Sequence, residues 1–357
     1  MIRPVILTLL ILLTGCHKGL RQPYRIETKP VESPAFADSV EQVWAYKLKA
    51  HPNQIIVLND SLVLFGDSNG GVTVLNGHNG ERIDRYWKPF KRPVQLYGIV
   101  DSVLYFSSET INEMMAWDIA NAKNIWKRNF RFDYNEMIYD DSTLYLKSDS
   151  TLAKINALSG DTLSSVKLKG KSAAGFIYTH ETFYVCSQNG QLCAFDKNLK
   201  NKGNVNLKLN VVESVSQHKE LLIAYNTGGS IRLYSPVTGM IQYSKDFNEL
   251  LYAPPTIQRD LVIVPYANGT VVAYSLENES QQWSYSFKSL LNLELLATEE
   301  NLIIPYARGR VVGLDFSGHE LWRYDHGKSV DYAALLHSGV LLGHRREISL
   351  TGVKNEN

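Results

Sequence analysis

Short apolar stretches recur along this chain about every 40 residues, and each follows a polar turn. The first three copies are DSLVL at 60–64, DSVLY at 101–105 and DSTLY at 141–145. Later copies begin at Glu181, Glu220, Asp260, Asn301 and Gly339. The stretches alternate or stay apolar for only four to six residues, which predicts β-strands. A helical solenoid would instead place apolar residues three and four positions apart, and a parallel β-helix would need a shorter repeat.

Residues 256–287 show the content of one repeat. A short strand at 256–257, a polar turn at Asp260, a strand at 261–265, an Asn-Gly turn, a strand at 270–274 and a fourth strand at 282–287 follow in order. Further Asn-Gly pairs at 69, 79 and 189 and a Gly-Gly pair at 228 supply the positive φ angles of tight hairpins. Four antiparallel strands in about 40 residues are the signature of a propeller blade.

The last repeat lacks one strand, and the chain offers a matching strand before the first repeat. The last repeat contains strands at 333–336, 340–343 and 348–352 and lacks a fourth. Residues 43–48 (VWAYKL) match fourth strands such as 282–287 (QWSYSF), so they supply the missing one. We therefore predict an all-β fold, an eight-bladed β-propeller over residues 40–355 that is closed by an N-terminal strand. Seven blades are the alternative if two weak repeats merge.

Four tryptophans occupy the same place in different repeats: Trp44, Trp126, Trp283 and Trp322. A side chain of this size buries about 150–250 Å². We interpret the four as packing between blades, with stacking against a ligand as the alternative.

The N-terminus carries the features of a bacterial export signal. Arg3 precedes an apolar run at 5–13, and the tetrapeptide LTGC at 13–16 resembles a lipobox. The run is shorter than the ~20 residues of a membrane span. We expect residues 1–15 to be a signal peptide, Cys16 to carry lipid and residues 16–39, with three prolines, to form a solvated tether. His17 in place of Asp after the cysteine favours, by analogy, the periplasmic face of the outer membrane.

The chain has 37 basic and 36 acidic residues, and removal of residues 1–15 leaves 36 of each. A neutral chain argues against nucleic acid as a partner. The stretch GDSNGG at 66–71 resembles the segment around a serine protease nucleophile, but an extra Asn interrupts it and a hairpin turn is the better interpretation. The nine histidines show no metal-binding spacing, and phosphate and dinucleotide motifs are missing. We predict no catalytic residue, no metal and no cofactor.

Cys186 and Cys193 flank the Asn189-Gly190 pair. If that pair forms a two-residue turn, the cysteines face each other across the hairpin and could form a disulfide in an oxidising periplasm. The opposed position would be a hydrogen-bonded one, where bridging geometry is less favourable. Two free thiols are therefore the alternative.

A local basic patch falls in turns of two neighbouring repeats: Arg308, Arg310, His344, Arg345 and Arg346. In a propeller the turns between second and third strands and the loops between blades emerge on one face, where function is expected to collect. Arginine side chains suit carboxylates on a partner protein. We therefore expect these residues to contribute to partner binding, with ordinary solvated loop charge as the alternative.

The repeats resemble those of pyrroloquinoline quinone (PQQ) dehydrogenases, on the strength of an aromatic fourth strand (LWRY, 321–324) and a third strand followed by glycine (VVGLDFSG, 311–318). Those enzymes carry a vicinal cysteine pair, which this chain lacks. The lipobox, tether and eight small blades together resemble the BamB family of propeller lipoproteins of the outer-membrane barrel-assembly machinery. The third, fourth and fifth repeats depart from the pattern because their fourth strands lack Trp.

The resemblance implies a non-enzymatic scaffold that touches the barrel-inserting subunit, or another periplasmic protein, and is monomeric by itself. One alternative is a periplasmic sensor that binds a small molecule at the propeller axis. The other is a degenerate quinone dehydrogenase.

Overall fold

The computed structural model describes residues 40–352 except 60–61, 84–86, 109–111 and 337. The predicted signal peptide, Cys16 and the tether lie outside the described residues. Within the described ranges, no helix is long and apolar enough to cross a membrane.

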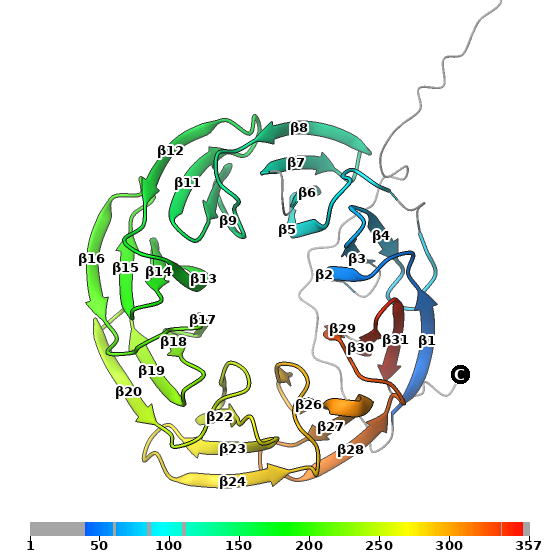
Figure 1. Ribbon diagram of the computed structural model, residues 1–357, viewed down its shortest axis with the longest axis vertical. Helices are drawn as coiled ribbons and strands as arrows, with labels where there is room; N and C mark the ends of the chain where they lie inside the picture. Colours follow the sequence, from blue (N-terminus) through cyan, green and yellow to red (C-terminus); the bar gives the residue numbers. More distant parts are fainter. Residues whose placement is uncertain (1–39, 60–61, 84–86, 109–111, 337, 353–357) are drawn as a thin grey trace, which may run out of the picture.

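Strands dominate the fold and follow one another in groups around a ring (Figure 1). The first groups are β2 (Pro52–Asn59), β3 (Leu62–Asp67) and β4 (Val72–Leu75); β5 (Val94–Val100), β6 (Val103–Ser108), β7 (Glu113–Asp118) and β8 (Lys123–Asn129); β9 (Glu136–Asp140), β10 (Thr143–Lys147), β11 (Thr151–Asn156) and β12 (Thr162–Lys167); and β13 (Ser172–Thr179), β14 (Thr182–Ser187), β15 (Gln191–Phe195) and β16 (Asn201–Asn206).

The second half of the ring repeats this order. It contains β17 (Ser214–His218), β18 (Leu221–Tyr225), β19 (Ser230–Ser235) and β20 (Met240–Asp246); β21 (Thr256–Gln258), β22 (Leu261–Pro265), β23 (Thr270–Ser275) and β24 (Gln281–Ser286); β25 (Leu296–Ala297), β26 (Leu302–Tyr306), the 3-10 turn η1 (Ala307–Gly309), β27 (Arg310–Leu314) and β28 (Glu320–Asp325); and β29 (Tyr332–Leu336), β30 (Gly339–His344) and β31 (Glu347–Gly352) with β1 (Glu41–Lys47).

These sheets confirm the predicted all-β propeller of antiparallel blades. The described strands form eight groups, and two of them share one sheet through a single parallel bridge between Ala174 and Ser214. The fourth segment of the first group is represented by the isolated bridges at Arg82 and Trp87. The count of eight blades therefore stays our interpretation of these groups.

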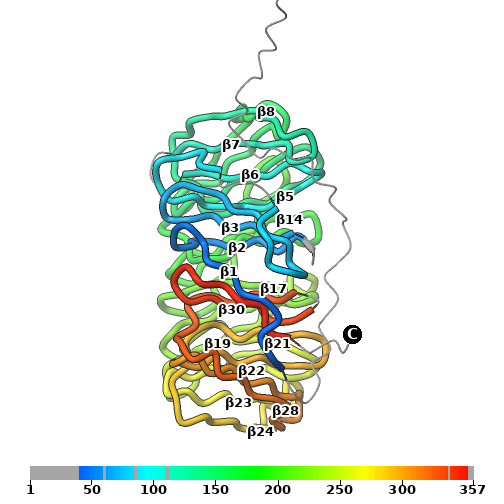
Figure 2. The backbone as a smooth tube through the Cα atoms, turned by 90° about the vertical axis from the view of Figure 1, so that its right-hand side faces the viewer, coloured from blue at the N-terminus to red at the C-terminus, as the bar shows by residue number. Residues whose placement is uncertain are grey.

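The N-terminal strand closes the ring, as the sequence predicts. β1 pairs antiparallel with β31, so that Trp44 lies opposite Leu350 and Tyr46 opposite Ile348. In the edge-on view the blue β1 passes beside the red C-terminal strands (Figure 2). Residues from the two ends of the chain share one apolar cluster, which contains Trp44, Leu341 and Phe65. A blade buries its faces only against its neighbours, so this contact completes the core.

The recurring polar turns have a definite backbone geometry. Asp101 and Ser102 both have positive φ, of 45° and 69°, and Asp141 and Ser142 have 43° and 60°. Two successive residues with positive φ fit a type I′ turn, whose twist matches that of the two strands it joins. In these two blades the sequence pattern therefore marks the innermost hairpin.

The tryptophans of the fourth strands pack against the next blade, which confirms their predicted structural role. Trp44 Nε1 donates to the Gly77 carbonyl at 2.8 Å, and Trp126 and Trp283 donate in the same way to Ala157 and Phe316 at 2.8 and 2.9 Å. Each indole lies on a turn glycine with positive φ: Gly80, Gly160 and Gly318. A Cβ at any of these glycines would approach an indole atom to 2.8 Å or less. We call this contact the tryptophan–glycine latch.

A matched pair of glycines tests the latch. Gly318 (φ 85°) lies under Trp283, whereas Gly239 (φ 69°) occupies the corresponding turn two blades earlier, where an added Cβ would meet no atom within 4 Å. Both alanine variants are destabilised because alanine disfavours the left-handed backbone conformation. Only Gly318→Ala must also displace an indole, that of Trp283. We expect Gly318→Ala to lower the free energy of unfolding by about 1–3 kcal/mol more than Gly239→Ala, measured by chemical denaturation. Equal losses would show that the latch does not constrain the blade.

A buried ion pair joins the two inner strands of one blade, and its carboxylate also contacts the next blade. Lys147 on β10 is 1% exposed, and its Nζ lies 2.6 Å from Glu136 Oε1 on β9. The same carboxylate oxygen accepts a hydrogen bond from the Gly175 amide of the next blade at 3.2 Å. Similar side-chain links from Gln95 to the Asn135 carbonyl and from Gln258 to the Thr298 carbonyl connect other neighbouring inner strands.

The predicted register of the cysteine hairpin is wrong. Cys186 lies opposite Leu192, and Cys193 lies opposite Val185. Three residues, 188–190, lie between the end of β14 and the start of β15, with Gly190 at φ 82°, instead of the two-residue turn expected from Asn189-Gly190. The offset of one residue puts the two side chains on opposite faces of the sheet. Both thiols are free, and burial raises the pKa of Cys186 to about 12.

Candidate interaction face

Turns between second and third strands and loops between blades lie on one face of the ring. The Val212 amide donates to the Gln188 carbonyl at 2.8 Å, and the Leu251 amide donates to the Thr227 carbonyl at 2.9 Å. The turn at Ala307 reaches back in the same way, because its amide donates to the Leu290 carbonyl at 2.8 Å. These loops are thus bonded to the turns beside them, and we call the face on which they lie the loop face.

The structure places the predicted basic residues on this face, at two turns. Arg308 lies in η1, Arg310 begins β27, His344 ends β30, and Arg345 and Arg346 form the next turn. The loop at 326–331 lies between these turns: the His326 amide donates to the Gly309 carbonyl at 2.7 Å, and Asp331 accepts from the Arg345 amide at 2.7 Å. The five predicted residues are therefore gathered around one loop.

Some of the five basic side chains contact neighbouring residues, and others are exposed. Arg310 stacks on Phe287, with its guanidinium carbon 5.2 Å from the ring centre, and Arg346 donates to the Lys49 carbonyl at 3.2 Å. His344 is half-buried and lies 3.3 Å from Asp331 Oδ2, so it is part of the local framework. The guanidinium groups of Arg308 and Arg345 are exposed and have no partner among the described residues.

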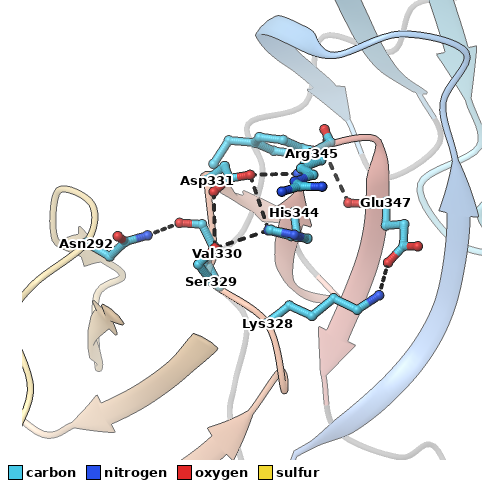
Figure 3. Close-up of polar contacts among 9 residues, drawn as sticks. Asn292, Lys328, Ser329, Val330, Asp331, His344, Arg345 and Glu347 are labelled. Carbon is cyan, nitrogen blue, oxygen red and sulfur yellow. Dashed lines mark hydrogen bonds and ion pairs between the residues drawn. The ribbon is translucent and has the colours of Figure 1, made fainter. Parts of the chain in front are cut away.

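Polar contacts hold the loop at 326–331 in place (Figure 3). Asp331 contacts both His344 and the Arg345 amide, and Ser329 Oγ lies 3.2 Å from His344 Nδ1. Lys328 forms an ion pair with Glu347, and Asn292 of the preceding loop donates to the Val330 carbonyl. The basic turns are thus presented on an ordered support, which lowers the entropy cost of binding a partner.

A row of exposed apolar side chains adjoins the basic turns. Val211, Leu250 and Leu290 are 64%, 63% and 58% exposed, and each precedes a buried residue that anchors its loop. They occupy equivalent positions in three successive loops between blades, and Tyr252 lies beside Leu250 with 40% exposure. We call Val211, Leu250, Tyr252 and Leu290 the apolar arc.

Sequence reasoning missed the apolar arc, although a signal was present. The doublets Val211-Val212, Leu250-Leu251 and Leu290-Leu291 are spaced by 39 and 40 residues, the period of the repeat. The second member of each doublet is buried in the core, whereas the first is exposed and is repeated without a structural need. Exposed apolar groups that gather on one face mark a surface for another protein.

Other candidate sites have structural roles or are not assembled. In the stretch at 66–71, Asp67 Oδ1 accepts the amides of Asn69 and Gly71 at 2.9 Å, which confirms the predicted turn. Among the residues that the structure describes, no three His, Cys, Asp or Glu side chains come together as a possible metal site.

Comparison with known proteins supports the resemblance seen in the sequence. Residues 204–334, somewhat more than a third of the chain, match the family model described as outer membrane protein assembly factor BamB. A search of curated protein sequences finds no significant match. The chain is thus similar to BamB in its repeats.

Solved structures share the fold at low sequence identity. BamB from Moraxella catarrhalis superposes with a TM-score of 0.73 at 14% identity, over 88% of this chain and 100% of that chain. Sqt1 from Saccharomyces cerevisiae gives 0.72 at 13% identity, over 89% and 100%. The quinohemoprotein alcohol dehydrogenase ADHIIG from Pseudomonas putida HK5 gives 0.68 at 11% identity, over 90% and 78%. These likenesses show the β-propeller fold, and the fold alone does not separate a scaffold from an enzyme.

Proposed function

We propose that this chain is a non-catalytic scaffold lipoprotein that assists the assembly of outer-membrane β-barrel proteins through protein–protein contacts. In this proposal Cys16 carries the lipid, and the propeller stands off the periplasmic face of the outer membrane on residues 16–39. The partner is a subunit of the barrel-assembly machinery. Arg308, Arg310, His344, Arg345 and Arg346 belong to the docking surface, together with the apolar arc.

One observation carries the proposal. The segment that matches the BamB family model, residues 204–334, contains the whole apolar arc and the turn with Arg308 and Arg310. Apolar side chains give a protein interface its affinity, and free arginines beside them give it orientation. The surface therefore fits a partner that offers apolar groups flanked by carboxylates.

Paired variants of the full-length chain test the surface. We expect Leu250→Ser with Leu290→Ser to lower recovery of the barrel-assembly subunit from crosslinked membranes at least about tenfold, since two central apolar contacts contribute about 1–2 kcal/mol each. Arg308→Glu with Arg345→Glu should have a similar effect that grows weaker at high salt.

A matched control lies away from the loop face. Leu158 in the β11–β12 turn is 73% exposed and Leu163 on β12 is 54% exposed, so Leu158→Ser with Leu163→Ser removes as much exposed apolar surface. That control should leave recovery unchanged. Undiminished recovery with both loop-face variants would remove this surface from the proposal, and recovery of a signalling or uptake protein instead would overturn the assigned function.

A further inference from the structure

A groove of about 350 Å³ lies at the outer rim of the ring, where the last two blades meet. One side consists of β1 and β31, with Tyr46, Lys47 and Ser349 among the lining residues. The other side is the loop between β28 and β29, which supplies His326 and Lys328. The volume is at the lower end of the range for small-ligand pockets. The groove lies off the propeller axis and outside the apolar arc.

Two buried polar atoms in this groove have no partner within the described part of the chain. Ser349 is 2% exposed, and its Oγ makes no hydrogen bond to any described residue. His326 Nε2 is also buried without a partner there. Nearly all buried polar atoms in folded proteins are hydrogen-bonded, and leaving one unpaired costs about 1–3 kcal/mol. Two such atoms on one groove indicate a position that a polar ligand completes.

The charges around the groove favour an anion. Lys47 and Lys328 are exposed cations on opposite sides, and the lining contains one acid, Glu347. Lys328 forms an ion pair with Glu347 and, together with Lys47, holds the pKa of that carboxyl below its usual value. Burial lowers the pKa of His326, which therefore stays neutral near pH 7 and can donate a hydrogen bond from one ring nitrogen. The groove thus has a net charge of about +1, the sum of two lysines and one carboxylate.

The framework of the groove is already formed. The loop that carries His326 and Lys328 is fixed by the contacts of Asp331 with His344 and with the Arg345 amide (Figure 3). On the other side, Ala45 is paired with Ser349 in the ladder that closes the ring. A ligand would therefore meet hydrogen-bonding groups that need little reordering.

We propose that this groove binds a small organic carboxylate. The Ser349 hydroxyl and the His326 imidazole donate to it, and Lys47 and Lys328 balance its charge. Ala45, which lies on the same face of the β1–β31 ladder as Ser349, contacts its carbon skeleton.

Titration of the full-length chain with succinate tests the proposal. The probe is the His326 Cε1–H resonance in ¹³C-histidine-labelled protein at pH 7, assigned by its loss in His326→Gln. We expect a saturable shift with succinate and none with succinamide, which has the same shape without charge. Ser349→Ala should weaken binding by roughly 10–100-fold, as expected for loss of one hydrogen bond to a charged group. Ser164→Ala, an exposed serine of β12, should not change it.

Each failure has a distinct meaning. A shift that does not saturate, or that is the same for succinate and succinamide, would contradict a carboxylate site. Unchanged affinity in Ser349→Ala would contradict the assignment of the buried hydroxyl. Since Ser349 Oγ has no partner to lose within the described ranges, the variant is expected to fold, and its unchanged histidine spectrum without ligand checks that.

Discussion

Replacing Trp44 with alanine is expected to lower the free energy of unfolding by about 3–5 kcal/mol, the cost of truncating a buried tryptophan. Trp44 is 8% exposed, donates a buried hydrogen bond to Gly77 and lies on Gly80 of the first blade. It belongs to the strand that closes the ring, so the loss should also open the closure locally. Chemical denaturation measures the first effect, and hydrogen exchange of the amides in β31 measures the second.

Trp126→Ala is the matched control. Trp126 is 4% exposed and makes the same hydrogen bond, to Ala157, at a junction between blades in the middle of the chain. We expect a similar loss of stability without faster exchange in β31. If both variants accelerate exchange in β31 equally, Trp44 has no special part in closing the ring.

Glu136→Leu should destabilise the propeller by about 3–5 kcal/mol, because it leaves the ammonium group of Lys147 buried without its carboxylate. Lys147 is 1% exposed, and Glu136 is its ion-pair partner. The double variant Glu136→Leu with Lys147→Met removes both charges and keeps an apolar side chain of similar length. It should recover most of the loss, because a buried ion pair replaced by apolar residues is often neutral in stability.

Chemical denaturation of the single and double variants measures whether the unpaired charge of Lys147 causes the loss of stability. Both lack the acceptor for the Gly175 amide, so that loss cancels in the comparison. A double variant as unstable as the single one would show that the cost comes from the amide contact and not from the unpaired charge.

Much of the fold can be predicted from the sequence because polar turns and apolar strands recur with a constant period. The turns at Asp101-Ser102 and Asp141-Ser142 need positive φ at two successive residues, and polar residues tolerate that conformation. Fourth strands are recognisable from Trp44 and Trp283 because each latch needs an indole at a fixed place. Closure follows from the same repeat, since the final blade lacks one strand at one end and the chain offers it at the other.

The incorrect cysteine register and the two missed surfaces arise where the sequence pattern does not determine the three-dimensional geometry. Asn189-Gly190 fits a two-residue turn and a three-residue turn equally well, and only the backbone decides which residue each cysteine faces. The apolar arc is hidden because Leu250 and Leu290 extend apolar doublets whose second members are core residues. The groove beside Ser349 combines residues that lie about 300 positions apart in the chain, so no local motif could reveal it.

Ring closure by β1 is the central structural claim, and a cysteine pair tests it most directly. Ala45 is paired with Ser349, so Ala45→Cys with Ser349→Cys in a chain lacking its native cysteines should form an intramolecular disulfide under mild oxidation. Ala45→Cys with Leu350→Cys is offset by one residue and places the thiols on opposite faces, so it should stay reduced. Mass spectrometry distinguishes the two. A bridge in the offset pair, or none in the aligned pair, would contradict the closure.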